Sequence, residues 1–287
     1  MIAVNQSCMD ALEFLRGDAY HEARIGPTNF APSKSMDPVP ARPEAIWSRG
    51  SWSRAGRRAH RRARWGRRVV IALFSLLFVL PVLVLLLFRF VPVPATPQMV
   101  LSWVSGKDAH HSWISAKRIS PVLTRAVVAS EDQNFCSHHG FDWSAINSAV
   151  RAHEDGARLR GASTISQQTA RSLFLLPVRS WVRKGLEAWL TVLMETLWPK
   201  PRTMTVYLNI VDWGNGNFGA EAASRAYFHR SAGSLSATEA ARLAAILPDP
   251  DDWRAARPGP YVARRSAILL ARMSQVRRDG LDSCLRH

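Results

Sequence analysis

The chain has 287 residues, 47% of them hydrophobic, and a formal net charge of +16, which is enough for one sizeable domain with an appendage or for two small domains. Lysine is scarce, so arginine supplies nearly all of the positive charge, and such a balance favours nucleic acid, membrane surfaces or phosphorylated substrates as partners. The position of the charge argues against nucleic acid, because residues 49–68 hold nine arginines and no acidic residue directly before a hydrophobic run.

Residues 1–68 are expected to form a cytoplasmic, basic and largely disordered tail. Prolines are scattered through residues 1–48, which are mixed in composition. The arginines of 49–68 are explained by membrane topology and by attraction to anionic lipid headgroups. No nucleic-acid partner is therefore expected.

Residues 69–88 form an apolar run that only Ser75 and Pro81 interrupt. About 20 apolar residues cross a bilayer as a helix, and a soluble core helix rarely has this length without a charge. A cleaved signal peptide is a poor alternative, because the run is long, lies deep in the chain and lacks a clear cleavage site. The arginines before it predict a single-pass transmembrane helix at 69–90 in a bacterial inner membrane, with the N-terminus cytoplasmic and residues 91–287 periplasmic.

The three cysteines are Cys8, Cys136 and Cys284, and they show no CxxC or cysteine–histidine metal spacing. Cys136 and Cys284 both follow the apolar run and could form a disulfide, but a domain of this size does not need one. Free thiols without functional weight are therefore expected, with the disulfide as the alternative.

Residues 91–287 are predicted to form one mainly helical domain after a stiff, proline-rich linker at 91–97. No convincing run of alternating strand residues is visible. Residues 181–197 carry leucines at helical spacing, and Ser236 with Glu239 resembles a capped helix start. The charged, glycine-dotted residues 154–161 are predicted to be a mobile loop. The predicted helices are 121–130, 143–153, 164–175, 181–197, 202–210, 218–227, 237–246 and 260–277.

A polar stretch between apolar runs, residues 131–142, holds three carboxylates, two histidines and a glycine. A carboxylate beside buried apolar surface is costly unless it has a partner or a task. Glu131 opens the stretch and is the candidate acid or base. Taken alone, the stretch could also be an ordinary surface loop.

Residues 161–168 indicate a loop that enters a helix, because Thr164 and Gln167 fit a capping box. A helix N-terminus with hydroxyls and free N–H groups is a ready anion site, although a well-capped helix without further function has the same pattern. Downstream, Arg171 and Arg179 flank an apolar run that suits either lipid headgroups or a plain core.

Glu187 lies on the predicted amphipathic helix 181–197 and directly follows a basic pair, Arg183 and Lys184. A lone helical glutamate is usually a solvated side chain. Here the neighbouring cations could hold a phosphate group beside it. Glu195, two turns later, is the weaker candidate and is expected to be structural.

An ordered set of short motifs runs through residues 131–248: Glu131-Asp132-x-x-Phe135-x-x-His138-x-Gly140, Gly161-x-Ser163-Thr164-Ile165-x-Gln167-Gln168, Arg183-Lys184-x-x-Glu187, Tyr207-Leu208-Asn209, Gly219-Ala220-Glu221 and Leu247-Pro248. This set resembles the peptidoglycan glycosyltransferase family, and residues 180–188 and 205–210 look most like its stand-alone, monofunctional members. The chain has little room for the transpeptidase domain of the bifunctional members, and none of its five lysines lies three residues after a serine.

The resemblance implies a mainly α, lysozyme-like, two-lobed glycosyltransferase domain preceded by the single transmembrane helix. It also implies polymerisation of lipid II, a disaccharide-pentapeptide on a polyprenyl pyrophosphate, into β-1,4-linked glycan. The acceptor 4-hydroxyl would attack the anomeric carbon with inversion, and Glu131 matches the family's general base. Glu187 matches the second family glutamate, near the leaving pyrophosphate.

The same resemblance implies a divalent cation, Mg²⁺ or Mn²⁺, but no organic cofactor and no assigned metal-ligating residue. The implied partners are lipid II, the growing glycan strand, membrane lipids and cell-division or wall-synthesis proteins.

Two residues depart from the pattern of the family. Arg171 stands at a position where the family commonly has lysine, and Cys136 stands at a position where relatives often have proline. Asp132 and His138 are expected to shape the loop, and His139 has no assigned role. The implied substrate-binding residues are Ser163, Thr164, Gln168, Arg171, Arg179, Lys184 and Asn209.

Two rival classes stay open at this point. A lysozyme-like peptidoglycan hydrolase or lytic transglycosylase also uses paired acids, but it gains little from arginine and lysine beside the second carboxylate. The second rival class is a catalytically inactive membrane scaffold, and the presence of both Glu131 and Glu187 argues against this class.

Overall fold

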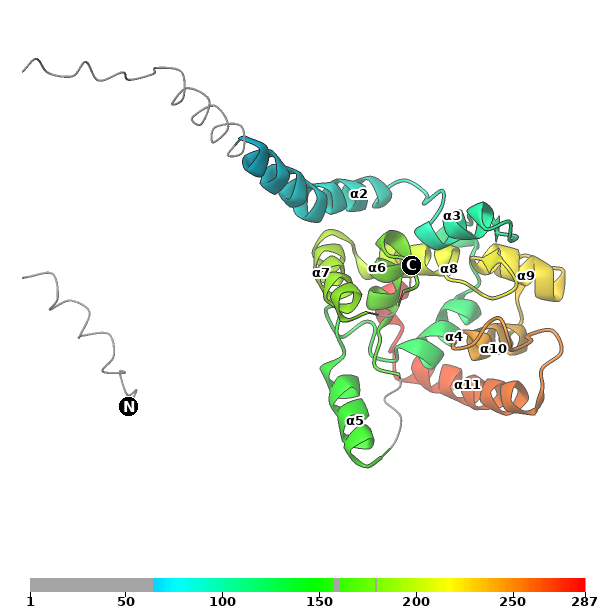
Figure 1. The fold of residues 1–287 in the computed structure, drawn as a ribbon. Helices are drawn as coiled ribbons and strands as arrows, with labels where there is room; N and C mark the ends of the chain where they lie inside the picture. The colour runs from blue at the N-terminus through cyan, green and yellow to red at the C-terminus, as the bar shows by residue number, and fades with distance from the viewer. Residues whose placement is uncertain (1–63, 157–160, 179, 287) are drawn as a thin grey trace, which may run out of the picture. The chain divides into compact units, whose positions relative to one another are not determined.

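The computed structural model describes residues 64–156, 161–178 and 180–286, which all belong to one compact unit that starts at Ala59. Most of the predicted tail at 1–68 lies outside the described residues, as does part of the predicted loop at 154–161. Figure 1 shows that the described part is built almost entirely from helices.

A long apolar helix, Arg64–Phe88, opens the described chain and is long and apolar enough to cross a membrane. It contains a π-helical segment, η2 (Ser75–Val79), followed by α2 (Leu80–Phe88). Pro81 has no N–H to donate to the carbonyl four residues earlier, so the regular α-helical ladder is interrupted at this point. The observed helix ends two residues before the predicted limit of 90.

All eight helices predicted in the domain are present, with small shifts at their ends. They are α4 (Pro121–Glu131), α5 (Trp143–Glu154), α6 (Ile165–Phe174), α7 (Trp181–Leu197), α8 (Lys200–Ile210), α9 (Ala220–Phe228), α10 (Ala237–Ile246) and α11 (Pro260–Arg278). The predicted capping boxes of Thr164 with Gln167 and of Ser236 with Glu239 are both formed.

Two features of the domain were not predicted. The last residue of the predicted linker, Pro97, is the first residue of α3 (Pro97–Val104), where the Thr96 side chain caps the helix and the fixed φ of proline suits its first turn. Two-residue strands β1 (His110–His111) and β2 (Asn217–Phe218) pair in parallel. They are too short to produce an alternating pattern in the sequence.

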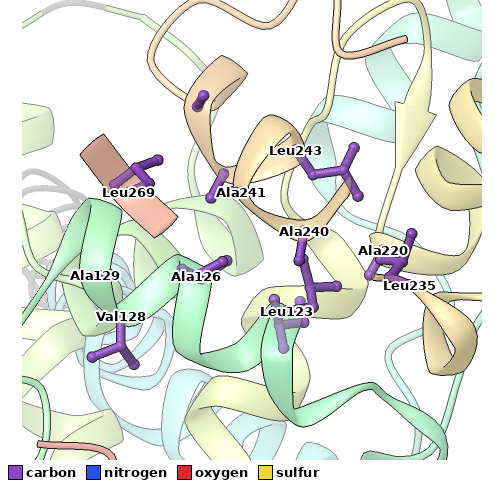
Figure 2. Packing of buried hydrophobic residues seen from close by; sticks show 14 of the residues in the cluster. Leu123, Ala126, Val128, Ala129, Ala220, Leu235, Ala240, Ala241, Leu243 and Leu269 are labelled. Carbon is purple, nitrogen blue, oxygen red and sulfur yellow. The ribbon is translucent and has the colours of Figure 1, made fainter. Parts of the chain in front are cut away.

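The larger hydrophobic core lies where α4 packs against α10 and α11 (Figure 2). Small side chains face one another there, including the fully buried Ala126, Ala240 and Ala241, so the helices can approach closely. This packing fixes α4, whose last residue is Glu131.

A second hydrophobic cluster joins α6, α7 and α8 to the end of the long N-terminal helix. Leu85 of α2 is fully buried in it, together with Met194 of α7. The Trp198 indole donates to the Leu85 carbonyl at 2.7 Å, and the Arg202 guanidinium donates to the Phe88 carbonyl. The apolar helix is therefore docked on the helical domain through its C-terminal half, from Leu77 to Phe88.

The C-terminal segment turns back after α11 and forms a disulfide between Cys284 and Cys136. The expectation of free thiols is therefore wrong. The two cysteines are 148 residues apart in sequence, and only the return of the chain after Gly280 brings them together.

Candidate active site

Glu131 is placed by the end of α4. Val127, Val128 and Ala129 anchor this helix in the core, and the backbone leaves the helical region at Asp132. Glu131 is half-buried and lines a cleft of about 260 Å³ that Ser163 lines as well. The carboxylate is thus rigidly supported from behind and open to a substrate in front.

Both oxygens of the Glu131 carboxylate accept hydrogen bonds from the protein. The Ser130 hydroxyl lies 3.0 Å from Oε1, and Gln168 Nε2 donates to Oε2 at 3.1 Å. The Tyr207 hydroxyl donates to the Gln168 amide oxygen at 3.2 Å, which turns the amide nitrogen toward Glu131. Complete burial, followed by the negative charge of Glu131, raises the pKa of Tyr207 well above its usual value, so Tyr207 stays a neutral donor.

A second set of contacts reaches Glu131 through Ser130. The Ser130 hydroxyl has one proton and two acceptors in range, Glu131 Oε1 and the Ala244 carbonyl at 3.1 Å. Arg265 of α11 donates to the same hydroxyl oxygen at 3.2 Å. Helices α10 and α11 therefore take part in fixing the carboxylate, although they are far away in sequence.

The loop after Glu131 is held by Asp132, as expected. Its Oδ2 accepts from the backbone N–H of Ile165 at 3.0 Å, and its Oδ1 lies 2.9 Å from His138 Nε2. Gly140 N–H donates to His138 Nδ1 at 3.1 Å, so the proton of a neutral His138 is on Nε2, facing Asp132. Asp132 and His138 shape the loop and connect it to the start of α6.

Gly140 makes a close approach that excludes a side chain. Its φ is +90°, and a Cβ atom there would lie 2.9 Å from Thr191 Cγ2. Its carbonyl accepts from the Thr164 hydroxyl at 2.6 Å. Because that hydroxyl also caps α6, the structure gives Thr164 a supporting role at the wall of the cleft, while Ser163 beside it is half-exposed to the cleft.

Glu187 is fully buried on α7, with both carboxylate oxygens paired to cations. Arg183 Nη1 donates to Oε2 at 2.7 Å, and Lys184 Nζ binds Oε1. The structure brings the predicted Lys184 and Glu187 together, but no part of Glu187 is open to a reacting group. Its chemical role is to hold two cationic side chains, one of which, Lys184, keeps 40% of its side chain exposed.

The two predicted substrate-binding arginines are Arg171 and Arg179. Arg171 lies half-buried in the last turn of α6, three residues after Gln168, and its charge acts on Tyr207. Arg179 lies outside the described residues.

The substrate contact expected of Asn209 is wrong. Its side chain is completely buried, and its amide forms hydrogen bonds with the backbone N–H and carbonyl of Ile114 at 2.7 and 2.9 Å. Asn209 connects α8 to the segment before α4.

The expected divalent cation finds no protein-built site in the described residues, where no group of three or more His, Cys, Asp or Glu side chains could hold a metal. Mg²⁺ and Mn²⁺ need free oxygen ligands. Both oxygens of Glu187 are occupied by positive groups, which would also repel a cation. The residues present do not fit a resident metal.

The residues of the site that were not predicted include Ser130 and Arg272, which line the cleft, and Tyr207 and Arg265, which support Gln168 and Ser130. Ser130 is the neighbour of Glu131, and Tyr207 belongs to a motif that was quoted without a role. The two arginines of α11 carry no local signal, since only the tertiary packing brings Arg265 to Ser130 and Arg272 to the cleft.

The fold and the site define a mainly helical enzyme with one helix long and apolar enough to cross a membrane, one supported carboxylate in a cleft and a second carboxylate that holds basic side chains. The transglycosylase family profile matches residues 98–274, and the chain belongs to this family.

Curated proteins called biosynthetic peptidoglycan transglycosylase are similar over most of their length. The one from Caulobacter vibrioides is 49% identical over 219 residues, which cover 76% of this chain and 96% of the relative. The one from Chromohalobacter salexigens is 52% identical, covering 74% and 94%. The one from Pseudomonas aeruginosa is 50% identical, covering 71% and 90%.

Proposed function

We propose that this protein is a peptidoglycan glycosyltransferase that polymerises lipid II into β-1,4-linked glycan, with Glu131 as the general base. The observation that carries the proposal is the Glu131 carboxylate, fixed by Ser130 and Gln168 at the edge of an open cleft. The names of the relatives and the family match support the substrate class.

The reaction uses the lone pairs of the Glu131 carboxylate that do not accept a hydrogen bond from the protein. The carboxylate takes the proton of the acceptor 4-hydroxyl while that oxygen forms a bond to the anomeric carbon of the growing strand. The bond from this carbon to the pyrophosphate breaks, with inversion. The proton ends on Glu131 and the negative charge on the released polyprenyl pyrophosphate, so the leaving group needs cations more than a proton.

Basic side chains on α6 and α7 serve the pyrophosphate. Arg171 is half-buried one turn after Gln168, and the exposed part of Lys184 is held by Glu187. Arg183 adds a buried Nε–H for which the described residues supply no partner. A donor of this kind is suited to a phosphate oxygen. We assign Glu187 a positioning role and Arg179 a binding role in the same group.

We propose an orientation in which the N-terminus is cytoplasmic and the catalytic domain is periplasmic. The arginines before the apolar helix support this orientation. The Cys136–Cys284 disulfide after the helix also supports it, because disulfides persist in oxidising compartments.

Membrane lipids contact the apolar helix, and cell-division or wall-synthesis proteins are the proposed protein partners. Because the described residues do not fit a resident metal, the proposed Mg²⁺ or Mn²⁺ would be held by the pyrophosphate of the substrate, and titration with EDTA in the polymerisation assay tests the requirement.

The deciding experiment incubates the full-length enzyme with labelled lipid II and compares it with E131Q, which keeps the hydrogen-bonding shape but cannot accept the proton. Long glycan from the wild type and a loss of roughly 100-fold or more in E131Q are expected. Equal rates would remove Glu131 from the mechanism. Soluble fragments from intact sacculi, without glycan from lipid II, would support the hydrolase instead.

A further inference from the structure

The segment after α11, residues 279–286, lies beyond the 98–274 region that matches the family and returns to the loop that follows Glu131. We call it the C-terminal clamp. It turns at Gly280, where φ is +67°, and forms a short 3-10 helix, η5 (Ser283–Leu285).

The clamp is attached to the domain by three kinds of contact. Cys284 forms the disulfide with Cys136. Asp282 is only 5% exposed, and its Oδ2 accepts from Arg125 Nε of α4 at 3.0 Å. Leu281 and Leu285 pack against the same core as α4. The clamp thus lies against the helix that carries Glu131 and is covalently joined to the loop that follows this helix.

The partner of the clamp, Cys136, belongs to the loop 132–140 that orients the site. Phe135 beside it is completely buried, with Lys200 Nζ 4.5 Å from the centre of its ring. Asp132 in the same loop binds the backbone N–H of Ile165, and α6, which starts there, presents Gln168 to Glu131. A continuous series of contacts therefore runs from Cys284 to the carboxylate.

We propose that the C-terminal clamp is a positioning element of the active site and that its disulfide is required for full glycosyltransferase activity, an inference that rests on the proposed function. Clamp closure joins two thiols into one disulfide and releases two protons and two electrons. A thiol–disulfide oxidant outside the cytoplasm accepts them. Both cysteines are only partly buried, so a reductant can open the clamp in the folded protein.

The test uses the full-length protein in detergent with Cys8→Ser as background, so that only the clamp cysteines remain. The oxidised protein, the protein treated with dithiothreitol and C136S/C284S are compared in three measurements. These are initial rates of lipid II polymerisation over a range of lipid II concentrations, hydrogen exchange of residues 132–140, and Tm. S283A, which alters the exposed neighbour of Cys284 and keeps the disulfide, is the matched control.

Reduction is expected to lower kcat on the order of 10-fold with little change in KM, less than the 100-fold that ångström-scale misplacement of a catalytic group costs. Exchange in 132–140 becomes faster, C136S/C284S behaves like the reduced protein, and dithiothreitol leaves that variant unchanged. All rates are taken below the lowest Tm, so global unfolding does not contribute. S283A matches the oxidised background protein.

Equal kcat and equal hydrogen exchange of residues 132–140 in the oxidised and reduced proteins would overturn the role proposed for the clamp. Slower polymerisation with unchanged exchange in 132–140 would overturn it too, because the loop would then not be what the disulfide holds. An oxidised protein that makes no glycan at all contradicts the proposed function instead, and the exchange measurement still decides whether the disulfide orders the loop.

Discussion

The indole Nε1 of Trp189 donates a hydrogen bond to the backbone carbonyl of Leu77 at 3.1 Å. Leu77 is four residues before Pro81, so the carbonyl is the one whose usual helical donor the proline removes. The ring of Trp189 also meets Phe78 edge to face, with centroids 5.1 Å apart. The domain therefore binds the apolar helix at the carbonyl that lacks its usual α-helical donor.

This relationship predicts coupling between Trp189 and Pro81. W189F keeps the aromatic contact and loses the donor, which is expected to lower the free energy of unfolding in detergent by about 1 kcal/mol. In P81A the helix regains its own donor, so the same change at Trp189 has a smaller effect. A double-mutant cycle from unfolding measurements gives the coupling. Strictly additive effects would contradict the coupling.

Tyr207 is predicted to act on the rate without touching the substrate. Y207F leaves the Gln168 amide oxygen without its donor, so the amide nitrogen is free to turn away from Glu131. The expected result is a fall in kcat of about 10-fold with KM nearly unchanged, which corresponds to roughly 1.4 kcal/mol. Y261F on the surface of α11 is the control for removal of a tyrosine hydroxyl and should match the wild type. A change in KM alone would contradict the role given to Tyr207.

Local patterns in the sequence were sufficient for most of the helices. The leucines of 181–197 and the capping pairs at Thr164 and Ser236 depend on neighbours within one or two turns, and such signals survive in the fold. Pro97 shows the limit, because a proline fits an extended linker and the first turn of a helix equally well.

The site was less predictable than the helices, because its supports come from distant parts of the chain. Glu131, Gln168 and Ser163 were named from their motifs; in the structure Glu131 and Ser163 line one cleft, and Gln168 donates a hydrogen bond to Glu131. Asn209 was assigned to the substrate from its motif, but complete burial commits its amide to the backbone of Ile114. The positions of Arg265 and of the disulfide are set by the way the chain returns after α10, and no local pattern in the sequence predicts this return.

Glu187 gives a prediction that separates stability from activity. E187Q leaves Arg183 and Lys184 without their buried counter-charge, and loss of one partner from such a group is expected to lower the free energy of unfolding by about 3 kcal/mol. E187Q/K184M removes one of the two unpaired cations and should recover part of that loss. Its polymerisation rate should stay low, because a proposed pyrophosphate contact is gone. Urea unfolding and lipid II assays on both variants check this.

Recovery of activity together with stability in E187Q/K184M would show that Lys184 does not bind the substrate. K117M is the matched control, since Lys117 is a lysine of the domain far along the chain from α7 and has no place in the proposed site. It should leave both measurements unchanged.

Asp282 predicts how stability depends on pH. Burial acts to raise the pKa of its carboxyl, but hydrogen bonds from Arg286 and the charge and hydrogen bond of Arg125 outweigh this, so the pKa is lowered. A lowered pKa in the folded state means that the unfolded chain binds the proton more readily. The stabilisation is therefore complete above the unfolded value of about 3.9 and is lost as the pH falls through the folded value.

D282N removes this contribution at every pH. Its free energy of unfolding at pH 7 is expected to be lower by about 2 kcal/mol, because Arg125 loses a charged partner. The difference between wild type and D282N should shrink as the pH falls below about 4, because the Asp282 carboxyl of the unfolded wild-type chain then takes up a proton more readily than that of the folded protein. Other acidic groups titrate equally in both proteins and cancel. Urea unfolding at several pH values measures the difference, and a gap that stays constant from pH 7 to pH 3 would contradict the assigned ion pair.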